Sequence, residues 1–124
     1  MGEHLADGSF RIAEITIHPP RAVAFFVRLL ENSIHSLKRF FQHTGHNYRQ
    51  FNYLGEWHSH PNFPVTPSGT DHRSMWALVK ERQIGANFAV LMVIKLGKDG
   101  ALEGTAHAYM ASGELVSAQW HIES

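Results

Sequence analysis

Alternating apolar and polar residues near the start of the chain predict a strand over residues 10–17. Phe10 and Ile12 share one face of this strand, because strand side chains point alternately to opposite sides. The strand is entered through a turn at Asp7-Gly8. It cannot continue past Pro19-Pro20, since proline has no backbone N–H to donate to a ladder.

The apolar run at residues 22–27 fits either a strand or the approach to a helix, and the pattern does not decide between them. From residue 30 onward the apolar residues recur at the spacing of one helical stripe, while the opposite face is polar. The stripe consists of Leu30, Ile34, Leu37 and Phe41. Thr44-Gly45 is typical of a helix end, so the pattern predicts a helix over residues 30–44.

Alternation resumes over residues 51–60 and predicts a second strand, on which His58 and His60 would share a face. Three prolines between residues 61 and 67 break any regular element. A helical stripe then follows, formed by Met75, Leu78 and Val79, and predicts a helix from about residue 70 to residue 82. The proline-rich loop therefore joins a strand to a helix.

Residues 87–94 are almost continuously apolar, as in a strand that is covered on both faces. A turn at Asp99-Gly100 sends the chain back over residues 102–109, which predicts a β-hairpin. A turn at Gly113 precedes a last strand over residues 115–122. The chain shows no internal repeat, and at 124 residues it is expected to form one domain (1–124) with a mixed sheet and two helices.

Composition narrows the classes of function. Lys and Arg together number 11, as do Asp and Glu, so the formal net charge is zero. The chain therefore has no excess of positive charge to attract a nucleic acid or an anionic membrane surface. Cysteine is absent, which excludes disulfides, thiolate nucleophiles and sulfur ligands. The start of the chain has no secretory signal, and no stretch is long enough to span a bilayer, so we expect a soluble cytoplasmic protein.

Histidine is unusually frequent, with 10 residues spread from His4 to His121. Random placement would give about 0.7 His-x-His pairs, so His58-Ser59-His60 is weak evidence for a site by itself. On the pair alone, two surface histidines at a strand end are the simpler interpretation. Strand geometry would nevertheless place both imidazoles on one side, and the prolines hold the following chain in an open surface loop.

Asp71 offers a third ligand for a metal ion. Two neutral imidazoles and one carboxylate are the ligands of a catalytic zinc, whose fourth position is left to water. Such a zinc lowers the pKa of its bound water to about 7. The segment Ser68-Gly69-Thr70-Asp71 also matches a helix capping box, which explains Ser68 and Asp71 without a metal. The two roles are compatible, since a carboxylate in the first turn of a helix retains a lone pair for a cation.

The segment Gly55-Glu56-Trp57-His58-Ser59-His60-Pro61 is followed by ten residues (61 to 70) and then Asp71, with Ser68 three positions ahead of Asp71. It resembles the motif of the JAMM metalloproteases, also called MPN or JAB: His-Ser/Thr-His-Pro, a loop, then Ser-x-x-Asp. The resemblance implies that His58, His60 and Asp71 bind one zinc ion per chain and that Ser68 stabilises the oxyanion of the tetrahedral intermediate. The resemblance to the family extends more loosely from about Gly2 to the strand at residues 87–94.

The resemblance also implies the fold and the substrate. The fold would be α/β (α+β), a JAMM/cytidine-deaminase-like curved mixed sheet flanked by helices. The chain is similar to the prokaryotic JAB branch, whose members are associated with ubiquitin-like conjugation or sulfur-carrier systems. The implied function is zinc-dependent hydrolysis of a peptide or isopeptide bond at the C-terminal glycine tail of a ubiquitin-like or sulfur-carrier protein, which would be the partner.

One departure from the family concerns the catalytic base. Active members have a glutamate on an early strand, in a setting that resembles Glu-x-Gly-Gly-x-Leu-x-Gly, and this chain has no such glycine pair. Met1-Gly2-Glu3 fits the tail of that element, so we expect the N-terminal strand to be incomplete and the glutamate to precede Met1. Within the chain, Glu3 is the best-placed candidate base, and Glu56 shares a strand face with His58. The competing hypotheses are a catalytically inactive zinc-binding or scaffold module of the same fold, and a histidine-rich domain without metal.

Two neighbours of the motif have ordinary interpretations. His72 follows a proposed ligand but projects elsewhere on the helix. Trp76 is expected to pack in the core or at its rim.

Overall fold

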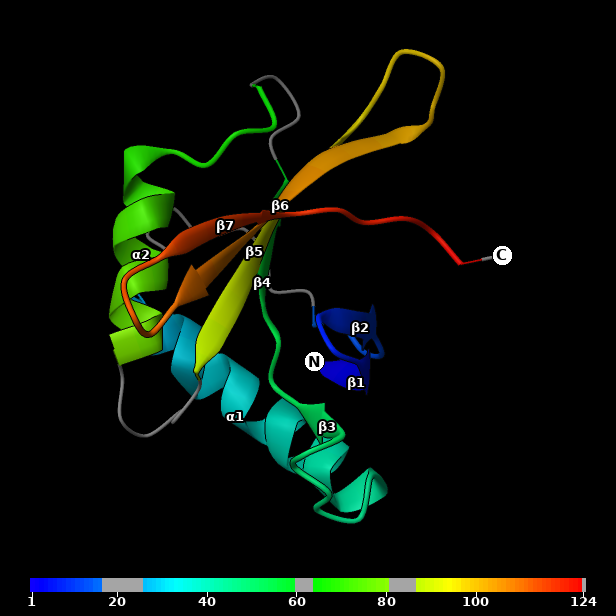
Figure 1. The fold of residues 1–124 in the computed structure, drawn as a ribbon, viewed down its shortest axis with the longest axis vertical. Helices are drawn as coiled ribbons and strands as arrows, with labels where there is room; N and C mark the ends of the chain where they lie inside the picture. The colour runs from blue at the N-terminus through cyan, green and yellow to red at the C-terminus, as the bar shows by residue number, and fades with distance from the viewer. Residues whose placement is uncertain (17–25, 60–63, 81–86, 124) are drawn as a thin grey trace. The chain divides into compact units, whose positions relative to one another are not determined.

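The computed structural model of the protein describes residues 1–16, 26–59, 64–80 and 87–123. These residues form a mixed α+β fold, in agreement with the predicted fold class, and their contacts divide the chain into two compact units, Met1–Leu54 and Gly55–Ser124. The single-domain organisation stays a prediction. The elements, labelled in Figure 1, are β1 (Gly2–Ala6), β2 (Ser9–Ile12), α1 (Phe26–His43), β3 (Phe51–Asn52), β4 (Gly55–Ser59), α2 (Gly69–Lys80), β5 (Phe88–Leu96), β6 (Leu102–Met110) and β7 (Leu115–Ala118).

The unit Met1–Leu54 contains an antiparallel sheet in the order β2-β1-β3. The predicted turn at Asp7-Gly8 joins β1 to β2, and Gly8 has the positive φ of 73° that favours glycine. The prediction of a strand as far as residue 17 is wrong, because β2 ends at Ile12 and residues 13–16 form no strand. The ladder with β1 ends at Gly2 opposite Ile12, and beyond it the amides of Ala13 and Glu14 both donate to the carbonyl of Met1, at 3.0 and 3.3 Å.

Helix α1 starts at Phe26, before the predicted residue 30. The last two residues of the ambiguous run at 22–27 are therefore helical, and residues 22–25 lie outside the described part of the chain. The predicted end is confirmed: Thr44 donates from both its amide and its hydroxyl to the carbonyl of Phe40, at 3.0 and 2.8 Å. Phe40 is buried, and its ring meets the edge of Phe51 on β3.

The prediction of one continuous strand over residues 51–60 is wrong, because β3 and β4 belong to different sheets. The break follows Asn52, whose side chain bonds to the local backbone. Its Nδ2 donates to the carbonyl of Tyr48 at 3.2 Å, and its Oδ1 accepts from the amide of Tyr53 at 2.8 Å. These contacts offer the backbone an alternative to a ladder. The chain therefore builds two sheets where one was predicted.

The unit Gly55–Ser124 contains a mixed sheet in the order β4-β5-β6-β7, in which β4 and β5 are parallel and the other pairs antiparallel. The predicted hairpin is confirmed, and its register runs from Phe88 opposite Met110 to Leu96 opposite Leu102. Gly55 allows β4 to approach β5, since a Cβ at this position would collide with the carbonyl of Val90. Strand β7 ends at Ala118, short of the predicted residue 122.

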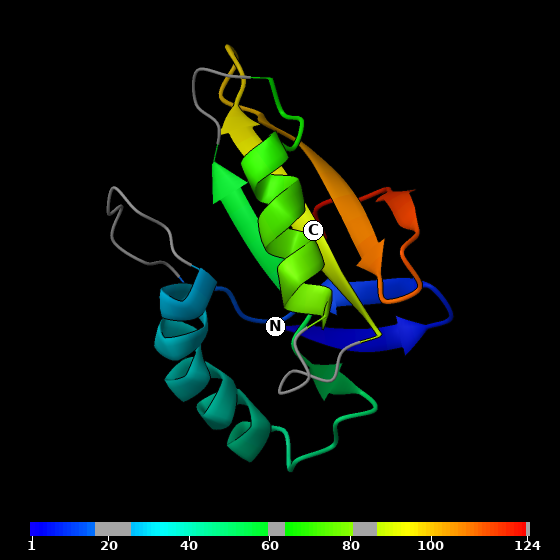
Figure 2. The ribbon, with the colours of Figure 1, turned by 90° about the vertical axis from the view of Figure 1, so that its left-hand side faces the viewer.

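Helix α2 packs across one face of this sheet, on strands β5 and β6 (Figure 2). The predicted stripe forms the core together with residues of β5 and β6, and none of these residues is more than 6% exposed. They are Met75, Leu78 and Val79 of α2, Ala89, Leu91 and Val93 of β5, and Tyr109 of β6. The helix spans Gly69–Lys80, and residue 82, its predicted end, lies outside the described residues. Neither α1 nor α2, the helices described, is both long and apolar enough to cross a bilayer.

Candidate functional site

The candidate site is built where β4 ends and α2 begins. His58 lies near the end of β4, opposite Val93 of β5. Asp71 lies in the first turn of α2, and Ser68 directly precedes this helix. His60 lies outside the described residues, so its position on the face of His58 stays a prediction.

Ser68 and Asp71 form the predicted capping box. The amide of Asp71 donates to Ser68 Oγ at 3.1 Å, and the amide of Ser68 donates to Asp71 Oδ2 at 2.8 Å. The helix begins immediately afterwards, with the amide of His72 donating to the carbonyl of Ser68 at 3.0 Å. These bonds satisfy N–H groups that have no partner inside the helix and fix the carboxylate at its start.

The structure brings His58 and Asp71 into direct contact across 13 positions of the sequence. His58 Nδ1 lies 2.8 Å from Asp71 Oδ1. The side chain of Asp71 is 9% exposed and that of His58 is 32% exposed. The pair is therefore anchored on the carboxylate side and open to solvent on the imidazole side.

Asp71 is held as a carboxylate. Burial raises its pKa, but hydrogen bonds from the backbone and side chain of Ser68, followed by the charge and hydrogen bond of His58, bring the pKa below the ordinary 3.8. An ionised carboxylate can only accept hydrogen bonds, so Nδ1 of His58 must carry the hydrogen between them. In the neutral imidazole the lone pair then lies on Nε2.

This chemistry fits a divalent metal ion such as zinc. An imidazole nitrogen and a carboxylate oxygen are both zinc ligands, and an ion that replaced the hydrogen between His58 Nδ1 and Asp71 Oδ1 could be bound by both. Within the residues that the structure describes, no three His, Cys, Asp or Glu side chains gather as a metal-binding group. His60, the remaining member of the predicted ligand set, is outside that part of the chain.

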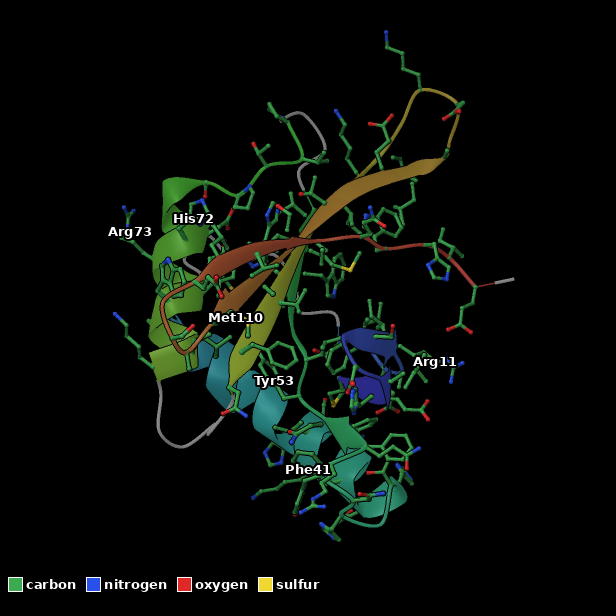
Figure 3. All side chains as sticks on the ribbon, viewed as in Figure 1. Arg11, Phe41, Tyr53, His72, Arg73 and Met110 are labelled. Carbon is green, nitrogen blue, oxygen red and sulfur yellow. The ribbon has the colours of Figure 1, made fainter. Side chains whose placement is uncertain are left out.

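His72, Trp76 and Tyr109 form a support that the sequence analysis missed. The hydroxyl of Tyr109 lies 2.8 Å from His72 Nδ1, and the ring of Trp76 meets Tyr109 edge to face at a centroid distance of 5.0 Å. Burial, and then the charge of Asp71, raise the pKa of Tyr109 to about 12. The expected packing role of Trp76 is confirmed. In Figure 3, His72 lies between α2 and the sheet, whereas Arg73 points away from the sheet.

One feature of the sequence could have indicated this support. The predicted strand at residues 102–109 carries polar side chains at alternate positions, Thr105, His107 and Tyr109, between alanines. Strand periodicity places all three on one face. In the structure this is the face toward α2, because Tyr109 contacts His72 and Trp76 there.

Glu3, the candidate base, is held by two partners within the unit Met1–Leu54. Its Oε2 forms an ion pair with Arg11 Nη1 at 2.9 Å, and its Oε1 accepts from Gln50 Nε2 at 3.0 Å. Glu56 lies on β4 opposite Leu91 and shares a face with His58, as strand alternation predicted. The catalytic role of Glu3 stays a prediction.

Comparison with known proteins identifies the family. No curated protein and no solved structure matches the chain. A family model described as "Prokaryotic homologs of the JAB domain" matches residues 6–121, which includes the whole segment from β4 through α2. The chain therefore belongs to the family of prokaryotic JAB-domain proteins.

Proposed function

We propose that this protein is a hydrolase that cleaves a peptide or isopeptide bond with one zinc ion, held by His58, His60 and Asp71. The observation that carries the proposal is the 2.8 Å contact between His58 and Asp71, two ligand-type side chains that the fold brings together from β4 and α2. Membership of the JAB family supports a hydrolase role. Bound by these residues, zinc would activate a water molecule and polarise the carbonyl to be attacked.

The residues of the chain have separable roles in this proposal. In the structure Asp71 accepts the Nδ1 hydrogen of His58. Zinc would take the place of this hydrogen, which would move to Nε2, so that Nδ1 and the carboxylate could both be ligands. The exposed Ser68 is fixed by the amide of Asp71, which donates to its Oγ. Its single hydroxyl hydrogen, which stabilises the Asp71 carboxylate in the structure, would have to turn to the substrate oxyanion. Loss of such a donor costs about 3 to 4 kcal/mol of transition-state stabilisation.

The substrate class is inferred from the resemblance of Gly55-Glu56-Trp57-His58-Ser59-His60-Pro61 to the prokaryotic JAB branch. We propose the C-terminal glycine tail of a ubiquitin-like or sulfur-carrier protein. Such a tail is extended and has small side chains, so its backbone can approach a site at the end of a strand.

A second candidate function is that of a zinc-binding module without turnover. It is favoured by the contacts of Glu3, whose two carboxylate oxygens are engaged by Arg11 and Gln50, and by the lack of the Gly-Gly setting of the family base. A base must contact the attacking water, whereas both carboxylate oxygens of Glu3 already contact side chains of the unit Met1–Leu54.

Metal analysis combined with a cleavage assay tests both candidates. The chain is purified after growth with zinc, its metal content is measured, and it is incubated with a ubiquitin-like protein fused through a Gly-Gly tail to a reporter. We expect one zinc per chain and a cleaved product in the wild type, neither in His58→Ala, and both in His121→Ala, an exposed histidine outside the motif. Zinc without product, both in this chain and in one with the residues upstream of Met1 restored, supports the non-catalytic module. A wild type with no zinc above trace contradicts both.

A further inference from the structure

The polar side of β6 contacts the candidate site at two places. This side carries Thr105, His107 and Tyr109. At one end of these three residues, Tyr109 bonds to His72 in the first turns of α2. At the other end, the hydroxyl of Thr105 donates to the carbonyl of Val65, 40 positions earlier in the sequence. Val65 lies in the loop that leads from the predicted ligand His60 to Ser68.

The protons of this contact can be assigned. A carbonyl oxygen can only accept, so the single hydrogen of the Thr105 hydroxyl is used for Val65. His107 Nε2 lies 2.9 Å from the same hydroxyl oxygen, so it must be the donor of the second hydrogen bond. Burial, and then the charge of His72, lower the pKa of His107 and favour its neutral form. The result is a directed chain, in which His107 Nε2–H donates to Thr105 and Thr105 donates to Val65.

The anchor acts close to the capping box. Only Thr66 and Pro67 separate Val65 from Ser68. Proline fixes its own φ and has no backbone N–H, so this short connection has little conformational freedom. With Val65 bound to β6, the start of α2 is held on one side by Thr105 through the loop and on the other by Tyr109 through His72.

We infer that Thr105 is a positioning residue for the candidate metal site, and that it acts with His107 by fixing the loop carbonyl of Val65. The inference rests on the proposed function, because it presupposes that Ser68 and Asp71 belong to a metal site. Ser68 and Asp71 are then placed by a strand far from them in the sequence as well as by their own capping box.

Three variants isolate the Thr105 hydroxyl. Thr105→Val removes it and keeps the branched shape, whereas Thr105→Ser keeps a hydroxyl. Thr44→Val is the matched control: the Thr44 hydroxyl also donates to a backbone carbonyl, that of Phe40 at 2.8 Å, but at the end of α1 in the unit Met1–Leu54.

The first measurement is amide hydrogen exchange at Ser68 in the metal-free chain, because this amide donates to Asp71 Oδ2 and reports directly on the capping box. We expect exchange about 3- to 10-fold faster in Thr105→Val and unchanged in Thr105→Ser and Thr44→Val. The second measurement is a titration with Co²⁺ alone, followed through its visible spectrum. Affinity should fall about 3- to 10-fold in Thr105→Val, with a changed spectrum that Thr105→Ser restores.

Equal exchange at Ser68 in Thr105→Val and in the wild type would overturn the inference. So would a uniform acceleration over all of β5 and β6, since this would indicate a loss of global stability only. Failure of the wild type to bind Co²⁺ would contradict the proposed function, and exchange at Ser68 would still decide whether Thr105 positions the loop.

Discussion

The two compact units of the chain use polar side chains in different ways. In Met1–Leu54, the ion pair of Glu3 and Arg11 lies on a small sheet whose apolar side chains remain exposed, such as Phe10 at 40% and Ile12 at 49%. In Gly55–Ser124, the contacts of Asp71 and Tyr109 lie against a sheet and helix with a buried core. No described side chain in either unit has a buried nitrogen or oxygen atom without a hydrogen-bond partner.

This difference indicates where a precise site can be built. Exposed ion pairs are screened by water and contribute about 0 to 1 kcal/mol to folding. A polar group surrounded by a packed core has few alternative positions, and an unmade hydrogen bond there is costly. The core of Gly55–Ser124 therefore provides the rigid support that the contacts of Asp71 require.

The largest expected effect is the loss of stability when Asp71 is replaced, compared with the replacement of Glu3. Asp71→Ala removes the capping box and the acceptor of His58, so we expect a loss of about 2 to 4 kcal/mol in the free energy of unfolding. Glu3→Ala should cost no more than about 1 kcal/mol, because it removes an ion pair on an exposed sheet. Denaturant unfolding of both variants measures the difference. Equal losses would break the contrast between the two units.

The stability that depends on Asp71 should also depend on pH. Its pKa is lowered on folding, so this contribution is present above the ordinary pKa of 3.8 and is lost as the pH falls through the lower folded value. In the metal-free chain, the difference in unfolding free energy between the wild type and Asp71→Asn should stay constant from about pH 7 to about pH 5. It should shrink below 3.8. A difference that shrinks already near neutral pH would point to another group.

A smaller effect is expected from a matched pair of tyrosines. Tyr109 is buried and its hydroxyl bonds to His72, whereas Tyr48 is 52% exposed and its hydroxyl lies 3.0 Å from His46 Nδ1. We expect Tyr109→Phe to lose about 0.5 to 1.5 kcal/mol in the free energy of unfolding, and Tyr48→Phe less than about 0.5 kcal/mol. Thermal unfolding of the two variants under the same conditions would show whether burial makes the difference.

The stability of the wild type and of Tyr109→Phe at alkaline pH tests the role of Tyr109 further. Because the pKa of Tyr109 is raised from 10.0 to about 12, its contribution to stability is complete below pH 10 and is lost as the pH rises toward 12. Tyr109→Phe should not show this alkaline loss. Unfolding measured at several alkaline pH values checks the sign, and an identical decline in both proteins would contradict it.

Features set by local sequence could be predicted. The turn at Asp99-Gly100, the stripe on α2 and the capping box of Ser68 and Asp71 all depend on residues within a few positions of one another, and each was found. The end of β2 was missed because it depends on where pairing with β1 ends. The break after residue 52 was missed although the contacts of Asn52 are local, because the alternation of apolar and polar residues continues through it.

The candidate site, too, could be predicted only in part. The spacing of the motif indicated that His58 and Asp71 belong together, although 13 positions separate them. Alternation along residues 105–109 indicates a polar strand face, but the contact of His72 with Tyr109 spans 37 positions and depends on how α2 packs on β6. Support for a site from a distant strand is therefore the part that required the structure.

Calorimetric titration of the metal-free chain with zinc tests the central claim most directly. We predict one binding site in the wild type and in His121→Ala, with affinity reduced more than about 100-fold in His58→Ala and in Asp71→Asn, a substitution that keeps the size of the side chain. Zinc binding of equal strength in all four proteins, or none in the wild type, would contradict the assignment of His58 and Asp71 as its ligands.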